Sequence, residues 1–101
     1  MNIEWIKEKI RNGDYELSGH AEEERQVDKI SMDDLEAALL AGSLLERYPN
    51  DPRGPSCLVL GYGERNRPIH IVCGKTPRGD LRIITVYLPG SPKWKTERER
   101  G

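Results

Sequence analysis

The stretch Leu17-Ser18-Gly19-His20-Ala21-Glu22-Glu23-Glu24-Arg25 contains a junction between a short strand and a helix. Apolar and polar residues alternate briefly at 15–17, which is typical of a strand. Ser18 is a suitable N-cap, and the glutamates fall in early helical turns, where the helix dipole favours negative charge. We therefore expect a strand at 15–17 and a helix from about Gly19 to Asp28.

Two further amphipathic helices flank this junction. The first carries isoleucines at helical spacing and ends at an Asn-Gly pair, and the third begins at a capping serine and ends before a glycine. These features lie at Ile3, Ile6, Ile10 and Asn12-Gly13, and at Ser31, Leu35, Ala38, Leu39 and Gly42. The third helix is expected to run to Ala41.

After Gly42 the apolar spacing changes to two, and it predicts strands at 44–48, 56–61, 68–73 and 81–88. The loop 49–55 is rich in turn-forming residues, and the later connections have hairpin lengths. The sequence thus predicts an α+β fold with two or three helices packed on one face of a four-stranded antiparallel sheet, leaving the other face partly open. We expect one domain over residues 1–95, with Trp94 docked on it and 96–101 frayed.

Composition favours a small single domain with unevenly distributed charge. The chain has 101 residues and a net charge of −1. Residues 1–50 hold 6 Lys and Arg against 12 Asp and Glu, and residues 51–101 hold 10 against 5. This division predicts a face that meets a polyanion, although ordinary helix and sheet surfaces would look the same.

Cysteine use and the N-terminal residues indicate the compartment. Cys57 and Cys73 lie in apolar strands without metal-ligand spacing, which favours buried free thiols in a reducing environment. No apolar run is long enough for a signal peptide or a membrane span. We expect a cytoplasmic protein with no membrane partner.

His20 and His70 are the only histidines. His20 falls in the first turn of its helix, where backbone N–H groups attract phosphate, but it could equally fix the junction through a backbone hydrogen bond. Strand alternation places His70 on the face opposite Ile69 and Ile71, positioned for a ligand or simply half-exposed. If the two rings meet, they could act as acid and base on one phosphate.

Other polar residues are weaker candidates. Alternation in the last strand places Thr85 and Tyr87 with Leu81 and Ile83, and Arg82 on the opposite side with Ile84, Val86 and Leu88. Tyr87 is a candidate for nucleotide contact or a packed aromatic, and Arg25 for phosphate binding or a surface ion pair. Basic residues around the hairpins could follow a phosphate backbone or belong to a solvated sheet surface; they are Arg65, Arg67, Lys75, Arg78 and Arg82. We expect no metal site and no cofactor, because metal-ligand and phosphate-loop motifs are lacking.

The order of these motifs resembles the bacterial family catalogued as domain of unknown function 4258, over about residues 15–95. The resemblance rests on Leu17-Ser18-x-His20-Ala21 with Arg25, Ile30-Ser31, Tyr48-Pro49, Pro68-Ile69-His70-Ile71-Val72, Ile84-Thr85-Val86-Tyr87 and Lys93-Trp94. That family is similar to RelE/BrnT-like toxins, small ribonuclease-fold proteins often encoded beside an antitoxin. The resemblance implies helices on an antiparallel sheet, possible RNA cleavage, an antitoxin partner, and His20, Arg25, His70, Thr85 and Tyr87 as recurring polar residues.

Our leading hypothesis is a toxin-like, metal-independent endoribonuclease acting on single-stranded RNA. The assignment that we favour has His70 as the base that takes a proton from the ribose 2′-OH and His20 as the acid that protonates the leaving 5′-oxygen, and the reverse assignment is the alternative. Arg25 stabilises phosphate charge, Tyr87 positions the nucleotide, and Thr85, Arg67, Arg82 and Lys75 contact substrate. The alternative is a non-catalytic binding or regulatory module that pairs with a partner protein through its sheet face or edge.

Overall fold

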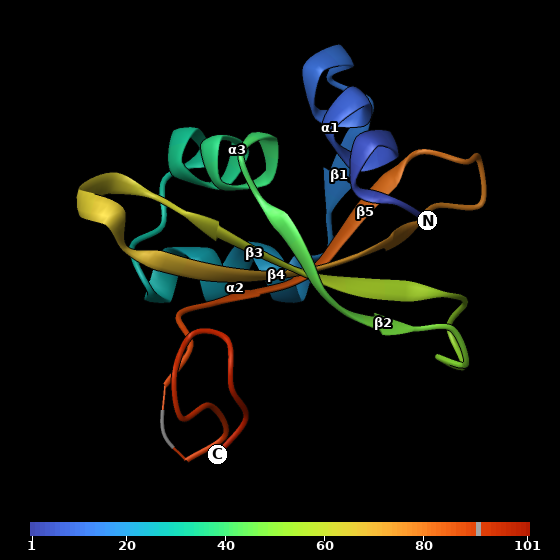
Figure 1. Cartoon of the computed structure of the whole chain (residues 1–101). Coiled ribbons are helices and arrows are strands. Elements are labelled where there is room, and N and C mark those ends of the chain that lie inside the picture. Colours follow the sequence, from blue (N-terminus) through green and yellow to red (C-terminus); the bar gives the residue numbers. More distant parts are fainter. Residues whose placement is uncertain (91) are drawn as a thin grey trace.

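Three helices pack on one five-stranded sheet in an α+β arrangement (Figure 1). The computed structural model describes residues 1–90 and 92–101. The helices are α1 (Ile3–Asn12), α2 (Gly19–Val27) and α3 (Met32–Leu40), with a short 3-10 helix η1 (Glu64–Asn66). The strands are β1 (Tyr15–Leu17), β2 (Ser43–Tyr48), β3 (Ser56–Tyr62), β4 (Pro68–Lys75) and β5 (Leu81–Tyr87).

The helix boundaries follow the local signals in the sequence. The Ser18 and Ser31 hydroxyls cap α2 and α3, each accepting from a backbone N–H three residues later at 3.0 Å. Gly13 ends α1 with φ of 72°, a left-handed conformation that glycine adopts at little cost. The predicted N-cap serines and the stop after Asn12 are therefore confirmed, and α3 ends one residue before the predicted Ala41.

The sheet has the strand order β1-β5-β4-β3-β2, and its β1–β5 pair is parallel while the other three pairs are antiparallel. The prediction of a purely antiparallel four-stranded sheet was wrong in this respect. β1 has only three residues, and Tyr15 lies opposite Leu81 from the far end of the chain. Such a long-range pairing leaves no periodic signal in the sequence.

Helices α1 and α3 cover one face of the sheet (Figure 1). Ile6, Leu35 and Leu39 are fully buried there against inward-facing side chains of β3, β4 and β5. Gly61 lets α3 approach β3 closely, because a Cβ at this position would lie 2.1 Å from the backbone oxygen of Ala38. The main hydrophobic core therefore lies between this face and the two helices. None of the helices among residues 1–90 and 92–101 combines the length and apolar character needed to cross a membrane.

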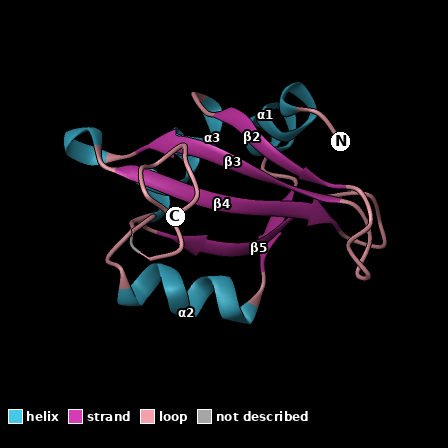
Figure 2. Ribbon diagram, turned by 60° about the horizontal axis from the view of Figure 1, so that its bottom comes forward, coloured by secondary structure: helices cyan, strands magenta, loops and turns pink. Residues whose placement is uncertain are grey.

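Helix α2 runs beside β5, along the part of this strand that β1 does not pair with (Figure 2). Because β1 pairs only with residues 81–83, the later backbone groups of β5 need other partners. The N–H groups of Val86 and Leu88 donate to the carboxylates of Glu24 and Asp28 at 3.1 and 3.4 Å. Glu24 in α2 and Asp28 at its C-cap are four residues apart, and they reach alternate residues at the end of β5 and just after it, so the helix protects the sheet edge.

The C-terminal segment, residues 92–101, lies against the opposite face of the sheet (Figure 2). Trp94 is 2% exposed, and Leu58, Leu60 and His70 are buried on this second face. Arg100 donates to both carboxylate oxygens of Glu46, at 2.9 and 2.7 Å, and its guanidinium lies 4.6 Å from the centre of the Trp94 ring. The sequence predicts an open face and a frayed tail at 96–101, whereas this segment covers part of that face.

A β-bulge changes which residues of β5 share a face. The register with β4 shifts so that Val72 lies opposite Thr85 but the next residue, Cys73, lies opposite Ile83. As a result Val86 is buried with Leu81 and Ile83 in the main core, and Tyr87 lies opposite His70. Simple alternation, which grouped Tyr87 with Leu81, was wrong here because one extra residue inverts the pattern.

Candidate functional site

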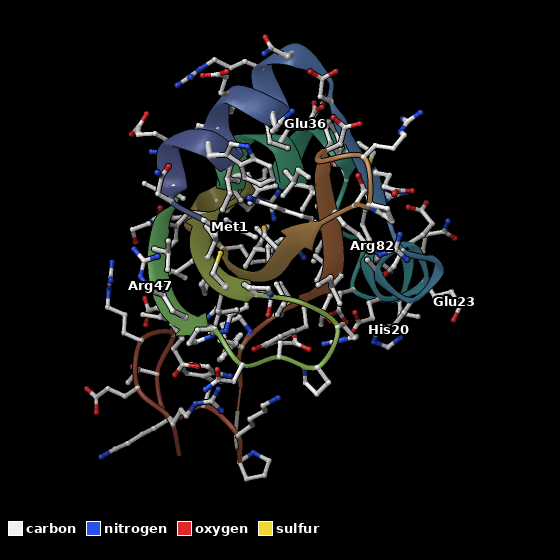
Figure 3. All side chains as sticks on the ribbon, turned by 90° about the vertical axis from the view of Figure 1, so that its right-hand side faces the viewer. Met1, His20, Glu23, Glu36, Arg47 and Arg82 are labelled. Carbon is white, nitrogen blue, oxygen red and sulfur yellow. The ribbon has the colours of Figure 1, made fainter. Side chains whose placement is uncertain are left out.

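A cavity of about 770 Å³ lies where the β4–β5 turn meets the start of α2 and the loop between β2 and β3. Figure 3 views the molecule with Met1, His20 and Arg82 labelled around this region. The cavity combines an apolar part with several basic side chains. Its lining residues are Met1, Ser18, His20, Arg53, Gly54, Pro55, Gly74, Lys75, Thr76, Pro77, Arg82 and Ile84.

His20 is the only histidine in the lining, and its position follows from the Ser18 cap. The Ser18 hydroxyl accepts from the N–H of Ala21 and donates to the carbonyl oxygen of Ile84 at 2.9 Å. These bonds attach the first turn of α2 to β5 at the edge of the cavity. The His20 side chain is 67% exposed, so a ligand can reach it.

Glu24 lies beside the His20 ring, one turn further along α2. Its Oε1 lies 3.3 Å from His20 Nε2 and also accepts the N–H of Val86 at 3.1 Å. The carboxylate is therefore fixed by the backbone of β5 and lies within ion-pair distance of the imidazole. A histidine next to a carboxylate is a common element of acid–base sites.

The basic lining residues differ in their partners. Arg53 contacts Asp51 at 3.2 Å, and Arg82 contacts Glu16 at 3.4 Å. Hydrogen bonds from Arg53 and Ser56 lower the pKa of Asp51 to about 2, so this carboxylate stays ionised beside the arginine at neutral pH. Lys75 instead lies over an aromatic ring, with Nζ 5.1 Å from the centre of Trp5.

Charge at the cavity favours an anionic ligand. Three cationic side chains and one histidine line it, and the described residues that line it include no carboxylate. Lysine and arginine in this arrangement bind phosphate through charge-assisted hydrogen bonds. The acidic partners of Arg53 and Arg82 lie outside the lining, so they hold these guanidinium groups in place rather than occupying the cavity.

His70 lies elsewhere on the sheet and is fully buried. Its Nε2 donates to the backbone oxygen of Glu97 at 2.8 Å, and its Nδ1 lies 3.1 Å from the Tyr87 hydroxyl. Burial lowers the pKa of His70 below its usual 6.5 and favours the neutral ring. Gly74 of the cavity is four residues further along β4, a distance of roughly 13 Å in an extended strand. His70 therefore lies in the contact between the sheet and the C-terminal segment, which we call the C-terminal contact, and not at the cavity.

Tyr87 and Arg25 also have partners within the fold. The Tyr87 hydroxyl accepts from Trp94 Nε1 at 3.1 Å, next to His70. Arg25 donates from Nε to Glu22 at 3.0 Å and from Nη1 to the backbone oxygen of Ile30 at 3.0 Å. These contacts match the alternatives of a packed aromatic and an ion pair within the helix.

The predicted substrate-binding residues separate into two groups. Lys75 and Arg82 line the cavity. Arg67 instead donates to the backbone oxygens of Asp28 and Lys29, at 3.2 and 3.1 Å, and so ties the start of β4 to the loop after α2. Thr85, on β5, lies opposite Val72 of β4. Along the strands this position falls between the cavity and His70.

Sequence reasoning missed several cavity residues, including Met1, Arg53 and Ile84. The turn-rich loop 49–55 indicates an exposed connection but not what it contacts, and Met1 reaches the cavity only through tertiary packing. Within the part of the chain that the structure describes, no three His, Cys, Asp or Glu side chains are grouped so that they could hold a metal ion.

Comparison with known proteins identifies one family. Residues 17–88 match the family described as Domain of unknown function (DUF4258). The matched region begins at the last residue of β1 and ends one residue after β5, so it includes the cavity residues of α2, β4 and β5. No curated protein and no solved structure matches the chain.

Proposed function

Since the chain belongs to the DUF4258 family, whose description assigns no activity, we propose its function from its own cavity. The protein is a toxin-like, metal-independent endoribonuclease that cleaves single-stranded RNA beside His20. The observation that supports this proposal is an exposed histidine, 3.3 Å from a fixed carboxylate, in a cavity lined by Arg53, Lys75 and Arg82. Cleavage of a phosphodiester uses both features: cations stabilise the charge on the phosphate, and an acid–base group moves the proton.

In the proposed reaction His20 acts as the general base through Nδ1. It takes the proton of the ribose 2′-OH, and the 2′-oxygen attacks phosphorus while the bond from phosphorus to the 5′-oxygen breaks. Water supplies a proton to the leaving oxygen, and the basic side chains stabilise the charge that develops on the phosphate. The products are a 2′,3′-cyclic phosphate and a 5′-hydroxyl.

The proposal places proton transfer on His20 alone and not on two histidines. His70 is buried with both ring nitrogens in contact with the fold, so it has no free nitrogen for a substrate. The hypothesis from the sequence favours His70 as base, but His70 is buried away from the cavity, so the proposal gives the role of base to His20. Arg25 supports the site indirectly by stabilising α2, whereas Tyr87 packs against the C-terminal segment and has no role in the proposed reaction.

The chemistry of the products tests this mechanism. Purified protein is incubated in EDTA with an RNA oligonucleotide and with the same sequence carrying 2′-O-methyl groups, and the fragments are analysed by mass spectrometry. We expect cyclic phosphate ends from the RNA and no cleavage of the methylated strand, which lacks the attacking hydroxyl. Cleavage of both strands, or 5′-phosphate ends, would contradict the proposal.

The rival proposal is a non-catalytic module that pairs with a partner protein such as an antitoxin. β2 supports it, because this strand forms one edge of the sheet and can accept another strand. β2 contains a bulge between Leu44 and Glu46, which limits regular pairing over its length. An absence of RNA cleavage in the assay above, together with co-purification of a partner protein that protects β2 from hydrogen exchange, would favour this second proposal.

A further inference from the structure

The cavity has an apolar floor as well as cations. Met1, Pro55, Pro77 and Ile84 line it together with the basic residues. A site for phosphate alone needs only charge and hydrogen-bond donors. The volume of about 770 Å³ falls within the range of small-molecule sites, roughly 300–1,000 Å³, and is much larger than one phosphate group requires.

Gly74 and Ile84 create this floor. Ile84 lies at the bulge of β5 and is half-exposed, and its Cδ1 lies across the backbone of Gly74 on the neighbouring strand. A Cβ on residue 74 would come within 2.9 Å of that methyl group. The glycine therefore allows Ile84 to lie flat over β4 and to present an apolar surface to the cavity.

The cations lie beside this surface. Arg82 is the direct neighbour of Gly74 in the β4–β5 register, and Lys75 is the next residue of β4. An apolar surface bordered by cations and a histidine is complementary to a nucleotide, which has a flat base attached through a sugar to a charged phosphate. Proteins that bind single-stranded RNA combine a surface that packs on the face of an unstacked base, usually an aromatic ring, with cations that follow the phosphates, and here Ile84 provides the apolar surface.

We propose that the cavity holds one unstacked nucleotide of the RNA, with its base on Ile84 and its 3′-phosphate between His20, Lys75 and Arg82. This inference rests on the proposed function and defines its substrate class, namely single strands with a base free to leave its neighbours. Duplex RNA keeps its bases stacked, and it is therefore a poor substrate.

Binding of nucleoside 3′-monophosphates tests the inference. Isothermal titration compares uridine and adenosine 3′-monophosphate with inorganic phosphate for the wild type, Ile84→Ala and the control Leu40→Ala, which alters an exposed leucine on α3. We expect the wild type to bind at least one of the nucleotides about tenfold more tightly than phosphate, because the base buries apolar surface. Ile84→Ala should lose that preference while its phosphate affinity and the control remain unchanged.

Gly74→Ala provides a second variant, since the added methyl group displaces Ile84 from the floor. Its folding is checked by circular dichroism, and its nucleotide preference should fall as in Ile84→Ala. Equal affinity of the wild type for nucleotides and phosphate would overturn the inference. If RNA were still cleaved in that case, only the base site would be excluded, whereas an absence of RNA cleavage would overturn the proposed function itself.

Discussion

His70 Nε2 donates a hydrogen bond to the backbone oxygen of Glu97 at 2.8 Å, which joins the middle of the sheet to the C-terminal segment. The carbonyl can only accept, so the ring carries its hydrogen on Nε2 and accepts from the Tyr87 hydroxyl at Nδ1. The ring also packs edge-on against Trp94, with centroids 4.5 Å apart. A neutral imidazole therefore holds this segment on the second face of the sheet.

Stability should fall in mild acid because of His70. Burial lowers the pKa of His70 below 6.5, so the unfolded chain binds more protons than the folded chain once the pH drops below that value. The free energy of unfolding should be highest above about pH 6.5 and decrease below it by at most about 1.4 kcal/mol per pH unit. Urea titrations at pH 7.5, 6.5 and 5.5 measure this decrease. His70→Gln should flatten the dependence, and an equally steep dependence in that variant would refute the explanation.

Trp94 should anchor the C-terminal segment. It is 2% exposed and donates from Nε1 to Tyr87 at 3.1 Å, so truncation removes both packing and a hydrogen bond. We expect Trp94→Ala to cost roughly 3–5 kcal/mol of unfolding free energy and to release the segment. Limited trypsin digestion measures the release through cleavage at Lys95 and Arg98. Trp5→Ala is the control, because half-buried Trp5 packs on the main core and its loss should leave the C-terminal segment in place. Equal resistance of wild type and Trp94→Ala would show that the segment needs no such anchor.

The Ser18 hydroxyl should contribute more to stability than that of Ser31. Both serines cap a helix, but Ser18 also donates to the carbonyl oxygen of Ile84 on β5. A lost cap costs about 1 kcal/mol, and the second hydrogen bond adds about 1 kcal/mol. Ser18→Ala should therefore lower the unfolding free energy by about 2 kcal/mol and Ser31→Ala by about 1 kcal/mol. Chemical denaturation of the two variants gives the comparison, and equal costs would mean that the bond to β5 contributes nothing.

The local part of this fold could be predicted from the sequence, since each helix carries its own cap and its own apolar spacing. The docking of Trp94 was also predicted, from its position as a single aromatic residue among charged ones, and its burial confirms it. The β1–β5 pairing and the bulge at Ile84 could not be predicted, because each depends on contacts between residues far apart in the chain. The same distinction applies to the site. His20 could be identified from its place after Ser18, whereas the hydrogen bonds of His70 to Glu97 and Tyr87 depend on where the C-terminal segment lies.

Lys75 should contact the RNA backbone. It lines the cavity, whereas Lys93 lies over the Tyr87 ring, with Nζ 5.7 Å from the ring centre, and does not line the cavity. Each phosphate contact to a single strand contributes about 0.7 to the slope of log affinity against log salt concentration. Fluorescence anisotropy with a labelled, 2′-O-methylated RNA should show this slope reduced by about 0.7 in Lys75→Ala and unchanged in Lys93→Ala. The same slope in both variants would place the RNA elsewhere.

Cleavage of single-stranded RNA in EDTA by matched histidine variants tests the central claim most directly. The substitutions His20→Gln and His70→Gln make the same chemical change in the cavity and in the C-terminal contact. We predict that His20→Gln lowers the single-turnover rate by about 10²–10⁴-fold, the usual effect of losing a general base. His70→Gln, measured where circular dichroism shows it to be folded, should cleave at nearly the wild-type rate. An unchanged rate in His20→Gln, or an equal loss in both variants, would contradict a ribonuclease centred on His20.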